Sequence, residues 1–387
     1  MKGSIRQRGR TWTAYWWTPD PATGDWRQHS KGGFANKTAA QKHLTATLAK
    51  VERGEWRPDR QFTVKELLED HWLPARKSEG LRRTTLSMYE RIVTNWLNPY
   101  IGAVEVSRLS PAIVQDAMER MRSDRLGPSK ETVTGVLTKG RSSRSVQLAA
   151  TVLKMATRWA LRNELLGRDP LVGYRRPRST SPSMTAWTAD EARAFIAATR
   201  NERLGVGWAL LLTRGLRRGE LCGLRWSAVD LDARVLRVVA TRVTIDGKAT
   251  DSVPKTSAGL RSIPLDDALA GLVRSHWAKQ AQERLVAGSA YADEGWVLAD
   301  QLGKPYDPNI VTKWFRERAK ELGLPAIRLH DTRHTAASLM LAEGTPVKVV
   351  SEVLGHASPT ITLTTYAHVM PGMAEEAGER LSARLLG

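Results

Sequence analysis

Alternating apolar and polar residues near the N-terminus predict a small sheet packed against a helix. The run TWTAYWW at 11–17 alternates as a strand does, PATGD at 21–25 has the composition of a turn, and a second strand-like run lies around WRQHSK. Helical spacing follows over residues 38–54. Since side chains alternate across a strand, one face carries Trp12, Ala14 and Trp16 and the other carries Tyr15 and Trp17. We expect at least half of these aromatic rings to form the core of the module.

Apolar residues at helical spacing predict a compact helical bundle in the next part of the chain. The segments with this spacing are 62–73, 84–102, 110–122 and 143–163. Thr63 and Glu66 fit a capping box that opens the first helix, whereas Pro99 and Gly102 predict the end of the second. The sequence GRDPLVG at 167–173 closes the bundle.

The remainder of the chain mixes helices and strands. Residues 174–186 are rich in Pro, Ser and Arg and are typical of a linker, after which Thr188 and Glu191 form a second predicted capping box. Further expected elements are helical residues 205–224, strands at 234–245 and 261–265, an exposed link at 247–260, and helices to the C-terminus. We find no tandem repeat, and the pattern predicts an α+β multidomain fold.

Composition is typical of a globular protein. The 387 residues suffice for two or three domains, with 41% hydrophobic and 26% charged residues. There is no apolar run of 18 residues, and MKGSIRQRGR at the N-terminus lacks the apolar core of a secretory signal. The single cysteine, Cys222, excludes internal disulfides and multi-cysteine metal clusters. We therefore expect a cytoplasmic protein.

Positive charge is concentrated in the first half of the chain. Residues 1–60 carry 12 Lys and Arg against 5 Asp and Glu, residues 61–178 carry 21 against 12, and the other 209 residues carry 26 against 23. Most of the net charge of +19 thus precedes residue 179, which favours a polyanionic partner, foremost nucleic acid. A membrane surface fits less well, because the charges do not gather on one amphipathic helix. A soluble basic protein without such a partner is the simpler alternative.

The N-terminal sheet offers a candidate DNA-binding face. The face opposite its predicted core would be edged by basic residues that could lie against DNA. These residues are Arg6, Arg8, Arg10 and Arg27.

Four motifs carry the chemistry of the last region. They are TRGLRRGEL at 213–221, PKTSAGLR at 254–261, HDTRHT at 330–335 and LGHASPTITLTTYAH at 354–368. Each is weak alone, but together and in this order they resemble the tyrosine recombinase (phage integrase) family. The likeness extends to the three-domain integrases of phages and integrative mobile elements. It implies an arm-type DNA-binding domain at 1–60, a helical core-binding (SAM-like) domain at 61–173, the linker 174–186, and a mainly helical catalytic domain with a small antiparallel sheet at 187–387.

The resemblance also implies roles for single residues. Tyr366 would be the nucleophile, and Glu220 would support the pocket from the family's acidic position. The other implied catalytic residues are Arg217, Lys255, His330, Arg333 and His356. Arg214 departs mildly from the pattern, because the family more often has a small residue before GLR.

These residue types suit DNA strand cleavage. Two arginines can offer planar forks of N–H donors to a phosphodiester, whose oxygens gain charge in the transition state. His330 lies three residues before Arg333, so on a helix both would point to one side. A tyrosine that attacks phosphorus exchanges one phosphoester for another, which needs no ATP. Lys255 in a turn could protonate the leaving 5′ oxygen. We therefore expect no metal and no cofactor.

A zinc site is the alternative for HDTRH, because His330 and His334 are four residues apart as in a zinc-hydrolase motif. A dication there would lie close to the guanidinium of Arg333, which is unfavourable. Asp331 is one methylene shorter than the glutamate that the motif requires, and a third ligand is not evident. We therefore expect His334 to be a packed, hydrogen-bonded histidine or a minor contributor to the pocket.

Several other residues have ordinary structural interpretations. We expect Arg218 to contact a DNA phosphate or the surface, His368 to be structural, and Trp187 and Trp226 to belong to the core. The last segment carries an apolar stripe four residues apart, which folds back on its own domain or, as the resemblance implies, docks on a neighbouring protomer. The stripe consists of Met373, Ala377, Leu381 and Leu385.

The sequence thus predicts a site-specific DNA recombinase, an integrase that joins a mobile element to a chromosome through a 3′-phosphotyrosine intermediate. Its expected partners are double-stranded DNA with core and arm sites, three further copies of itself in a tetramer, and an excisionase and a DNA-bending host factor; no membrane is expected. The expected setting is the nucleoid of a bacterial cell. The alternatives are a type IB topoisomerase and a DNA-binding regulator without catalysis.

Overall fold

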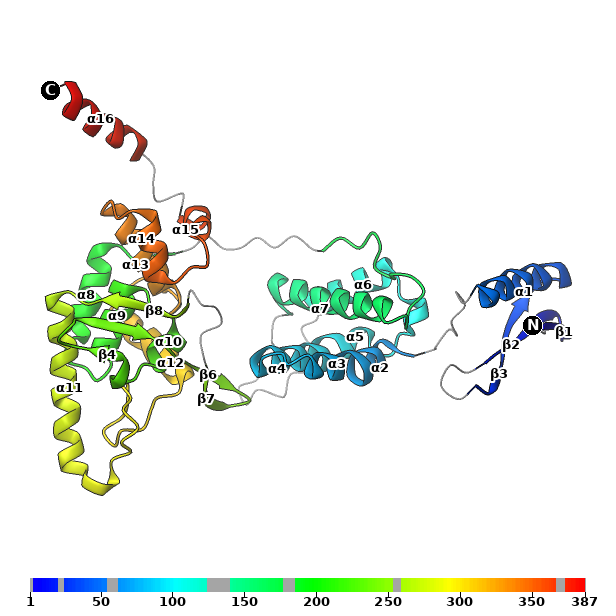
Figure 1. The fold of residues 1–387 in the computed structure, drawn as a ribbon, viewed down its shortest axis with the longest axis horizontal. Coiled ribbons are helices and arrows are strands. Elements are labelled where there is room, and N and C mark those ends of the chain that lie inside the picture. The colour runs from blue at the N-terminus through cyan, green and yellow to red at the C-terminus, as the bar shows by residue number, and fades with distance from the viewer. Residues whose placement is uncertain are drawn as a thin grey trace. The chain divides into compact units, whose positions relative to one another are not determined.

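A computed structural model describes residues 3–19, 24–53, 62–123, 140–176, 185–252, 259–366 and 373–386. The chain forms two compact units, Met1–Ser181 and Pro182–Gly387, which are described separately (Figure 1). No helix among the described residues is long and apolar enough to cross a membrane.

The first unit begins with the predicted sheet and helix. Strands β1 (Gly3–Arg8), β2 (Thr11–Pro19) and β3 (Trp26–Phe34) pair antiparallel in the order β1-β2-β3. Helix α1 (Lys37–Glu52) starts at Asn36, whose side chain accepts a hydrogen bond from the backbone N–H of Ala39. Its Leu44 packs with Ala14 and Trp16 from the sheet, so two of the three residues on the predicted apolar face belong to the core. Trp12, the third, is only partly buried.

The candidate DNA-binding arginines lie on two faces of this sheet. Arg6 pairs with Thr13, and residues paired across strands share a face, so Arg6 lies beside Tyr15; its guanidinium is 5.5 Å from the centre of that ring. Arg27 pairs instead with Thr18 and lies on the face of Trp16, so the prediction that it edges the same face as Arg6 is wrong. The sequence did not define the register between the two strands. Arg8 and Arg10 are exposed, as are Arg6 and Arg27.

The helical bundle completes the first unit. Its elements are α2 (Val64–Glu66), η1 (Leu67–Trp72), α3 (Leu73–Ser78), α4 (Arg83–Ile92), η2 (Val93–Leu97), α5 (Asn98–Ile101), η3 (Val106–Arg108), α6 (Pro111–Ser123) and α7 (Ser143–Arg162). The predicted capping box of Thr63 and Glu66 is present. Trp72 is fully buried in the core of the bundle.

A proline does not end the second helix of the bundle, contrary to prediction. The π-helical turn η2 precedes Pro99, with the N–H of Asn98 bonded to the carbonyl of Val93, and the helix continues to Ile101. A π-turn shifts the hydrogen-bond register, which accommodates the missing proline N–H. The chain leaves the helix at Gly102, as expected.

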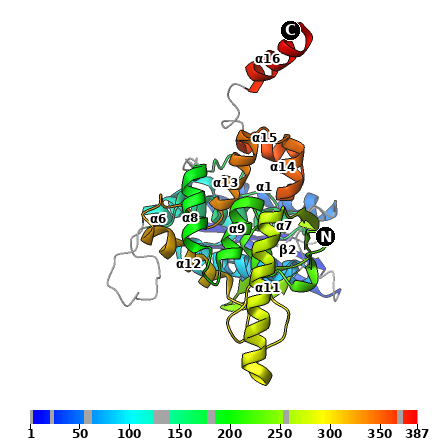
Figure 2. The same ribbon diagram turned by 90° about the vertical axis from the view of Figure 1, so that its left-hand side faces the viewer.

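The second unit is mainly helical. Its helices are α8 (Ala189–Thr199), α9 (Gly205–Arg214), α10 (Arg218–Cys222), η4 (Trp226–Ala228), α11 (Asp267–Ala287), η6 (Gly288–Ala290), α12 (Pro308–Glu321), α13 (Asp331–Ala342), α14 (Val347–Leu354), α15 (Pro359–Tyr366) and α16 (Met373–Leu386). Helices α8, α9 and α13 lie side by side, and α14 and α15 adjoin α13 (Figure 2). Trp187 is buried in the core, whereas Trp226 is only partly buried against it.

Two small antiparallel sheets accompany these helices. One has the order β4 (Val229–Asp230), β5 (Val235–Val238), β8 (Arg261–Pro264), and the other pairs β6 (Thr241–Ile245) with β7 (Lys248–Ser252). The single strand predicted over 234–245 is therefore two strands in different sheets. The expected exposed link also proves wrong at its start: Asp246 and Gly247, with φ of 50° and 78°, form a tight turn into β7.

Candidate active site

A buried carboxylate organises the site. Arg217 is the N-cap of α10, and the side chain of Glu220 accepts its backbone N–H at 2.9 Å and its Nη1–H at 2.6 Å. This arrangement requires the chain to reverse at Gly215, which adopts φ of 62° at the end of α9. A Cβ at Gly215 would also lie 2.4 Å from Leu354, so conformation and packing both demand glycine there.

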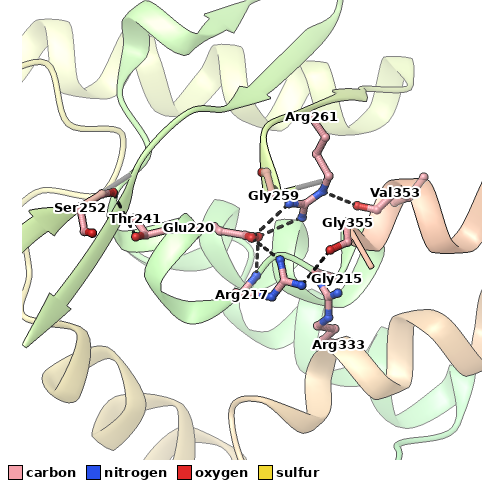
Figure 3. A network of polar contacts seen from close by, with 10 residues as sticks. All are labelled: Gly215, Arg217, Glu220, Thr241, Ser252, Gly259, Arg261, Arg333, Val353 and Gly355. Carbon is pink, nitrogen blue, oxygen red and sulfur yellow. Dashed lines mark hydrogen bonds and ion pairs between the residues drawn. The ribbon is translucent and has the colours of Figure 1, made fainter. Parts of the chain in front are cut away.

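A second arginine, Arg261 on β8, holds the same carboxylate (Figure 3). Its Nη1 and Nη2 donate to Oε1 and Oε2 of Glu220 at 3.1 and 2.9 Å. Burial raises the pKa of Glu220, but the hydrogen bonds and charges of Arg261 and Arg217 outweigh it, and the pKa lies below its ordinary value. Glu220 is therefore an anion at neutral pH.

Arg333 lies next to Arg217 and is almost fully buried, with 3% of its surface exposed (Figure 3). Its Nη1 donates to the carbonyl of Gly215 at 2.8 Å, while its buried Nη2 has no hydrogen-bond partner among the described residues. Burial, and then the charge of Arg217, lower the pKa of Arg333 to about 9. A cation with an unmet buried donor, beside a second cation, is an environment that favours an anion.

His330 and Arg333 come from the start of α13. His330 is the N-cap residue rather than part of the helix, and its ring lies 5.4 Å from that of His334. Desolvation, followed by the charges of His334 and Arg333, lowers the pKa of His330. Asp331 is paired with Arg328, from which it accepts a hydrogen bond at 2.7 Å.

His356 enters the site after α14. The helix ends at Gly355, which has φ of 68°, and the carbonyl of Gly355 accepts Nη2–H of Arg217 at 2.9 Å. Nδ1 of His356 is 2.8 Å from the hydroxyl of Thr362. Burial, with Arg333 and Arg217, lowers the pKa of His356 to about 4, so its imidazole is neutral at pH 7.

Tyr366 ends α15 and is fully buried. Its ring packs against side chains of α13 and α14, and its hydroxyl is 2.7 Å from Nδ1 of His334. Burial raises the pKa of Tyr366 to about 12, although the charge of Arg333 acts in the opposite direction. His334 is thus a hydrogen-bonded histidine, as expected, but its partner is the predicted nucleophile.

Other predicted residues lie outside this cluster. Lys255 and His368 fall outside the described residues. Arg218 points to α12, where its Nη1 donates to Asn309 and Thr312 at 3.2 and 3.0 Å. Its contact with DNA stays a prediction, as do those of the N-terminal arginines.

The unusual Arg214 has a structural role at the other end of β8. Its Nε donates to the carbonyl of Pro264 at 3.0 Å, and its Nη2 pairs with Asp266. The side chain thus ties α9 to the segment before α11.

The described part of the chain contains no group of three or more His, Cys, Asp or Glu side chains that could bind a metal ion. Nδ1 of His334 is bonded to Tyr366, and Asp331 is paired with Arg328. Asp331 is therefore not free to act as the base of the zinc alternative, and the described residues supply no third ligand for it.

Sequence reasoning missed Arg261. The motif PKTSAGLR ends in Arg261, which lies two residues before Ile263 on a predicted strand, so the two side chains share the apolar face. An arginine on the inward face of a strand needs a buried acidic partner, and that pattern could have revealed it.

Comparison with known proteins identifies the family. Residues 186–372 match the Phage integrase family, and residues 4–51 match the Arm DNA-binding domain. A XerC-like tyrosine recombinase of Caldanaerobacter subterraneus subsp. tengcongensis is 30% identical over 261 residues, which are 63% of this chain and 67% of that protein. The chain therefore belongs to the phage integrase family and is a tyrosine-type site-specific recombinase. Covalent phosphotyrosine chemistry is characteristic of this family.

Two solved structures share the fold. The integrase of transposon Tn1549, in complex with transposon right end DNA, has a TM-score of 0.66 at 19% identity and covers 84% of this chain and 100% of that one. The lambda integrase tetramer bound to a Holliday junction has a TM-score of 0.59 at 17% identity, with 94% of each chain covered.

Proposed function

We propose that this recombinase is the integrase of a mobile element and that Arg217 and Arg333 bind the scissile phosphate of double-stranded DNA. The observation that supports this most is the unmet Nη2 donor of Arg333. Arg333 is tied to the backbone by one hydrogen bond, so one edge of its fork is left for a phosphate oxygen. Arg217 presents a partly exposed guanidinium beside it.

The reaction conserves phosphoester bonds. The Tyr366 oxygen forms a bond to phosphorus, the bond from phosphorus to O5′ breaks, and the DNA 3′ phosphate becomes attached to the protein. Lys255 supplies a proton to O5′, which leaves as a hydroxyl. His330, beside the phosphate, accepts the phenolic proton of Tyr366 and returns it in the reverse step. His356 is neutral at pH 7 and acts as a hydrogen-bonding group. In the reverse direction a 5′ hydroxyl attacks the phosphotyrosine and reseals the strand.

Cleavage requires Tyr366 to move. Its side chain is fully buried in the free chain, so α15 shifts when DNA binds and brings the hydroxyl to the phosphate.

Strand exchange takes place in a homo-tetramer on two DNA sites. The fold likeness to a lambda integrase solved as a tetramer on a Holliday junction supports this assembly. Leu381, Leu385 and Leu386 of α16 expose 59%, 71% and 87% of their surface. We assign this helix to docking on a neighbouring protomer, because such apolar side chains gain most from burial.

The N-terminal residues bind arm sites, which are separate from the crossover site. The match of residues 4–51 to the Arm DNA-binding domain supports this role for residues 1–60. Residues 61–173 and 187–387 then clamp the core site, with 174–186 between them. Deletion of residues 1–60 is expected to abolish arm binding and spare cleavage of a nicked core duplex. Loss of both would show that this module has a structural role instead.

A plasmid carrying paired attachment sites tests the function in excess EDTA. The expected product has exchanged flanking sequences, and an excisionase or DNA-bending protein from the host cytoplasm is added in parallel to test the requirement for each. Relaxation without exchange would indicate a type IB topoisomerase. Binding without cleavage would indicate a regulator, and strict dependence on a metal would contradict the proposed chemistry.

A further inference from the structure

Arg261 connects three elements of the catalytic unit through one side chain (Figure 3). It extends from β8, donates two hydrogen bonds to Glu220 on α10, and donates Nε–H to the carbonyl of Val353 on α14 at 2.6 Å. The side chains of Arg261 and Glu220 are only 7% and 1% exposed. The contacts are thus made away from water, where such bonds are strongest.

This network determines where the guanidinium of Arg217 points. Arg217 uses Nη1 on Glu220 and Nη2 on the carbonyl of Gly355. Arg261 fixes both of these acceptors. It donates hydrogen bonds to the carboxylate of Glu220 and to the carbonyl of Val353, two residues before Gly355. The residue that follows Gly355 is His356. One arginine without access to substrate therefore controls the placement of two residues that would touch it.

We propose that Arg261 is a positioning residue for the recombination reaction, which orients Arg217 through Glu220 and His356 through the end of α14. This inference rests on the proposed function. Strand β8 also follows residues 253–258, which contain Lys255, so the same contacts hold the strand that leads away from the lysine.

Lysine cannot replace this arginine. The planar guanidinium of Arg261 makes two kinds of contact at once. Nη1–H and Nη2–H bond the carboxylate of Glu220, and Nε–H bonds the carbonyl of Val353, which lies in another direction. A lysine ammonium is a single point on a flexible chain and cannot reach the carboxylate and the carbonyl in this geometry. Removal of Arg261 would also leave Glu220 with Arg217 as its one cationic partner, and the carboxylate would draw that guanidinium away from the phosphate.

Arg214 provides a matched control. It too is an arginine that secures β8, by bonding Pro264 and Asp266 at the opposite end of the strand, and no contact joins it to Glu220. Arg214→Met therefore removes a comparable anchor without disturbing the network.

The experiment measures single-turnover formation of the covalent protein–DNA adduct on a nicked core duplex, together with the Kd for that duplex. Arg261→Met and Arg261→Lys are each expected to slow adduct formation about 10²-fold, the range found when one transition-state donor is lost. The Kd should change less than about 3-fold, and Arg214→Met should stay within about 3-fold of the wild type in rate. A wild-type rate in Arg261→Met, or equal losses in Arg261→Met and Arg214→Met, would overturn the proposal.

A substrate with a methylphosphonate at the scissile position separates positioning from general stability. The methylphosphonate is uncharged at the scissile position, so the rate of adduct formation depends less on where the guanidinium of Arg217 lies. The defect of Arg261→Met should shrink at least 10-fold on this substrate, as should that of Arg217→Lys; an unchanged defect would contradict the inference. If Arg261→Met fails to fold, the pair Glu220→Gln with Arg261→Met removes the unpaired buried charge and must show the same selective rescue. Absence of an adduct in the wild type would instead refute the proposed function.

Discussion

Nδ1 of His334 lies 2.7 Å from the hydroxyl oxygen of Tyr366, which ties the end of α15 to α13. Burial lowers the pKa of His334, so its ring is neutral at pH 7 and can accept the phenolic hydrogen. The helix that carries Arg333 therefore also holds the proposed nucleophile. In the free chain one helix thus carries the proposed phosphate-binding arginine and holds the proposed nucleophile until α15 shifts.

This contact should appear as a coupling energy. His334→Ala and Tyr366→Phe each remove one partner, so the free energy of unfolding of the double variant should exceed the value expected from additivity by about 1 kcal/mol. Urea denaturation measures it. His276→Ala serves as the control, because His276 bonds Val297 and should be additive with Tyr366→Phe. Additivity for His334 as well would show that the hydrogen bond does not persist in solution.

Arg333 should trade stability for activity. Arg333→Met removes a buried cation with an unmet donor, so the Tm is expected to stay the same or rise, while adduct formation falls about 10²–10³-fold. Arg333→Lys should also lose the activity, since an ammonium cannot bond Gly215 and a phosphate as a fork does. A large loss of stability in Arg333→Met would indicate that this arginine serves the fold and not the phosphate.

Gly215 should be the less replaceable of two glycines with similar conformations. At Gly215 an added methyl group would meet Leu354 at 2.4 Å, whereas at Gly344, with φ of 75°, nothing lies within 4 Å. Gly344→Ala is expected to cost about 1 kcal/mol from backbone strain alone, and Gly215→Ala clearly more, with slower cleavage because Leu354 adjoins Gly355. Equal costs in thermal denaturation would argue against this packing.

Stability should fall in mildly acidic solution. The pKa of His356 drops from 6.5 to about 4 on folding, so the unfolded chain binds a proton that the folded chain excludes. The stabilisation is complete above pH 6.5 and is lost as the pH falls towards 4. The pKa values of His276, His330 and His334 are lowered as well. His356→Gln should therefore reduce the dependence of the free energy of unfolding on pH without abolishing it. Denaturation at several pH values measures this dependence. If it is the same in His356→Gln and the wild type between pH 6.5 and 4, His356 is exposed to solvent.

Local patterns predicted much of the fold. Both capping boxes, at Thr63 and Thr188, are formed, because each needs only two residues three apart. The strand β7 was missed, although the Asp246–Gly247 pair is the usual sequence of a two-residue hairpin turn. The helix was expected to end at Pro99 but continues past it. Whether a proline ends a helix depends on the hydrogen bonds one turn earlier, which composition does not reveal.

The site was predictable by residue type but not by connection. The motifs point to Arg217, Arg333 and His356, which the structure brings together. Their side chains contact a carboxylate, backbone carbonyls or a hydroxyl group. The strand pattern indicates that Arg261 needs an acidic partner, but it does not say which one. The pairs Arg261–Glu220 and His334–Tyr366 could not be derived, since their members are 41 and 32 residues apart in the chain. Long-range packing, which spacing along a sequence does not encode, decides such pairs.

Mass spectrometry of the trapped covalent complex tests the central claim most directly. A nicked core duplex whose short 5′-hydroxyl fragment diffuses away should leave the protein joined to a DNA 3′ phosphate, and digestion should place the nucleotide on Tyr366. Tyr366→Phe should bind the duplex nearly as well and form no adduct. A nucleotide on any other residue, or an adduct that persists in Tyr366→Phe, would contradict the account.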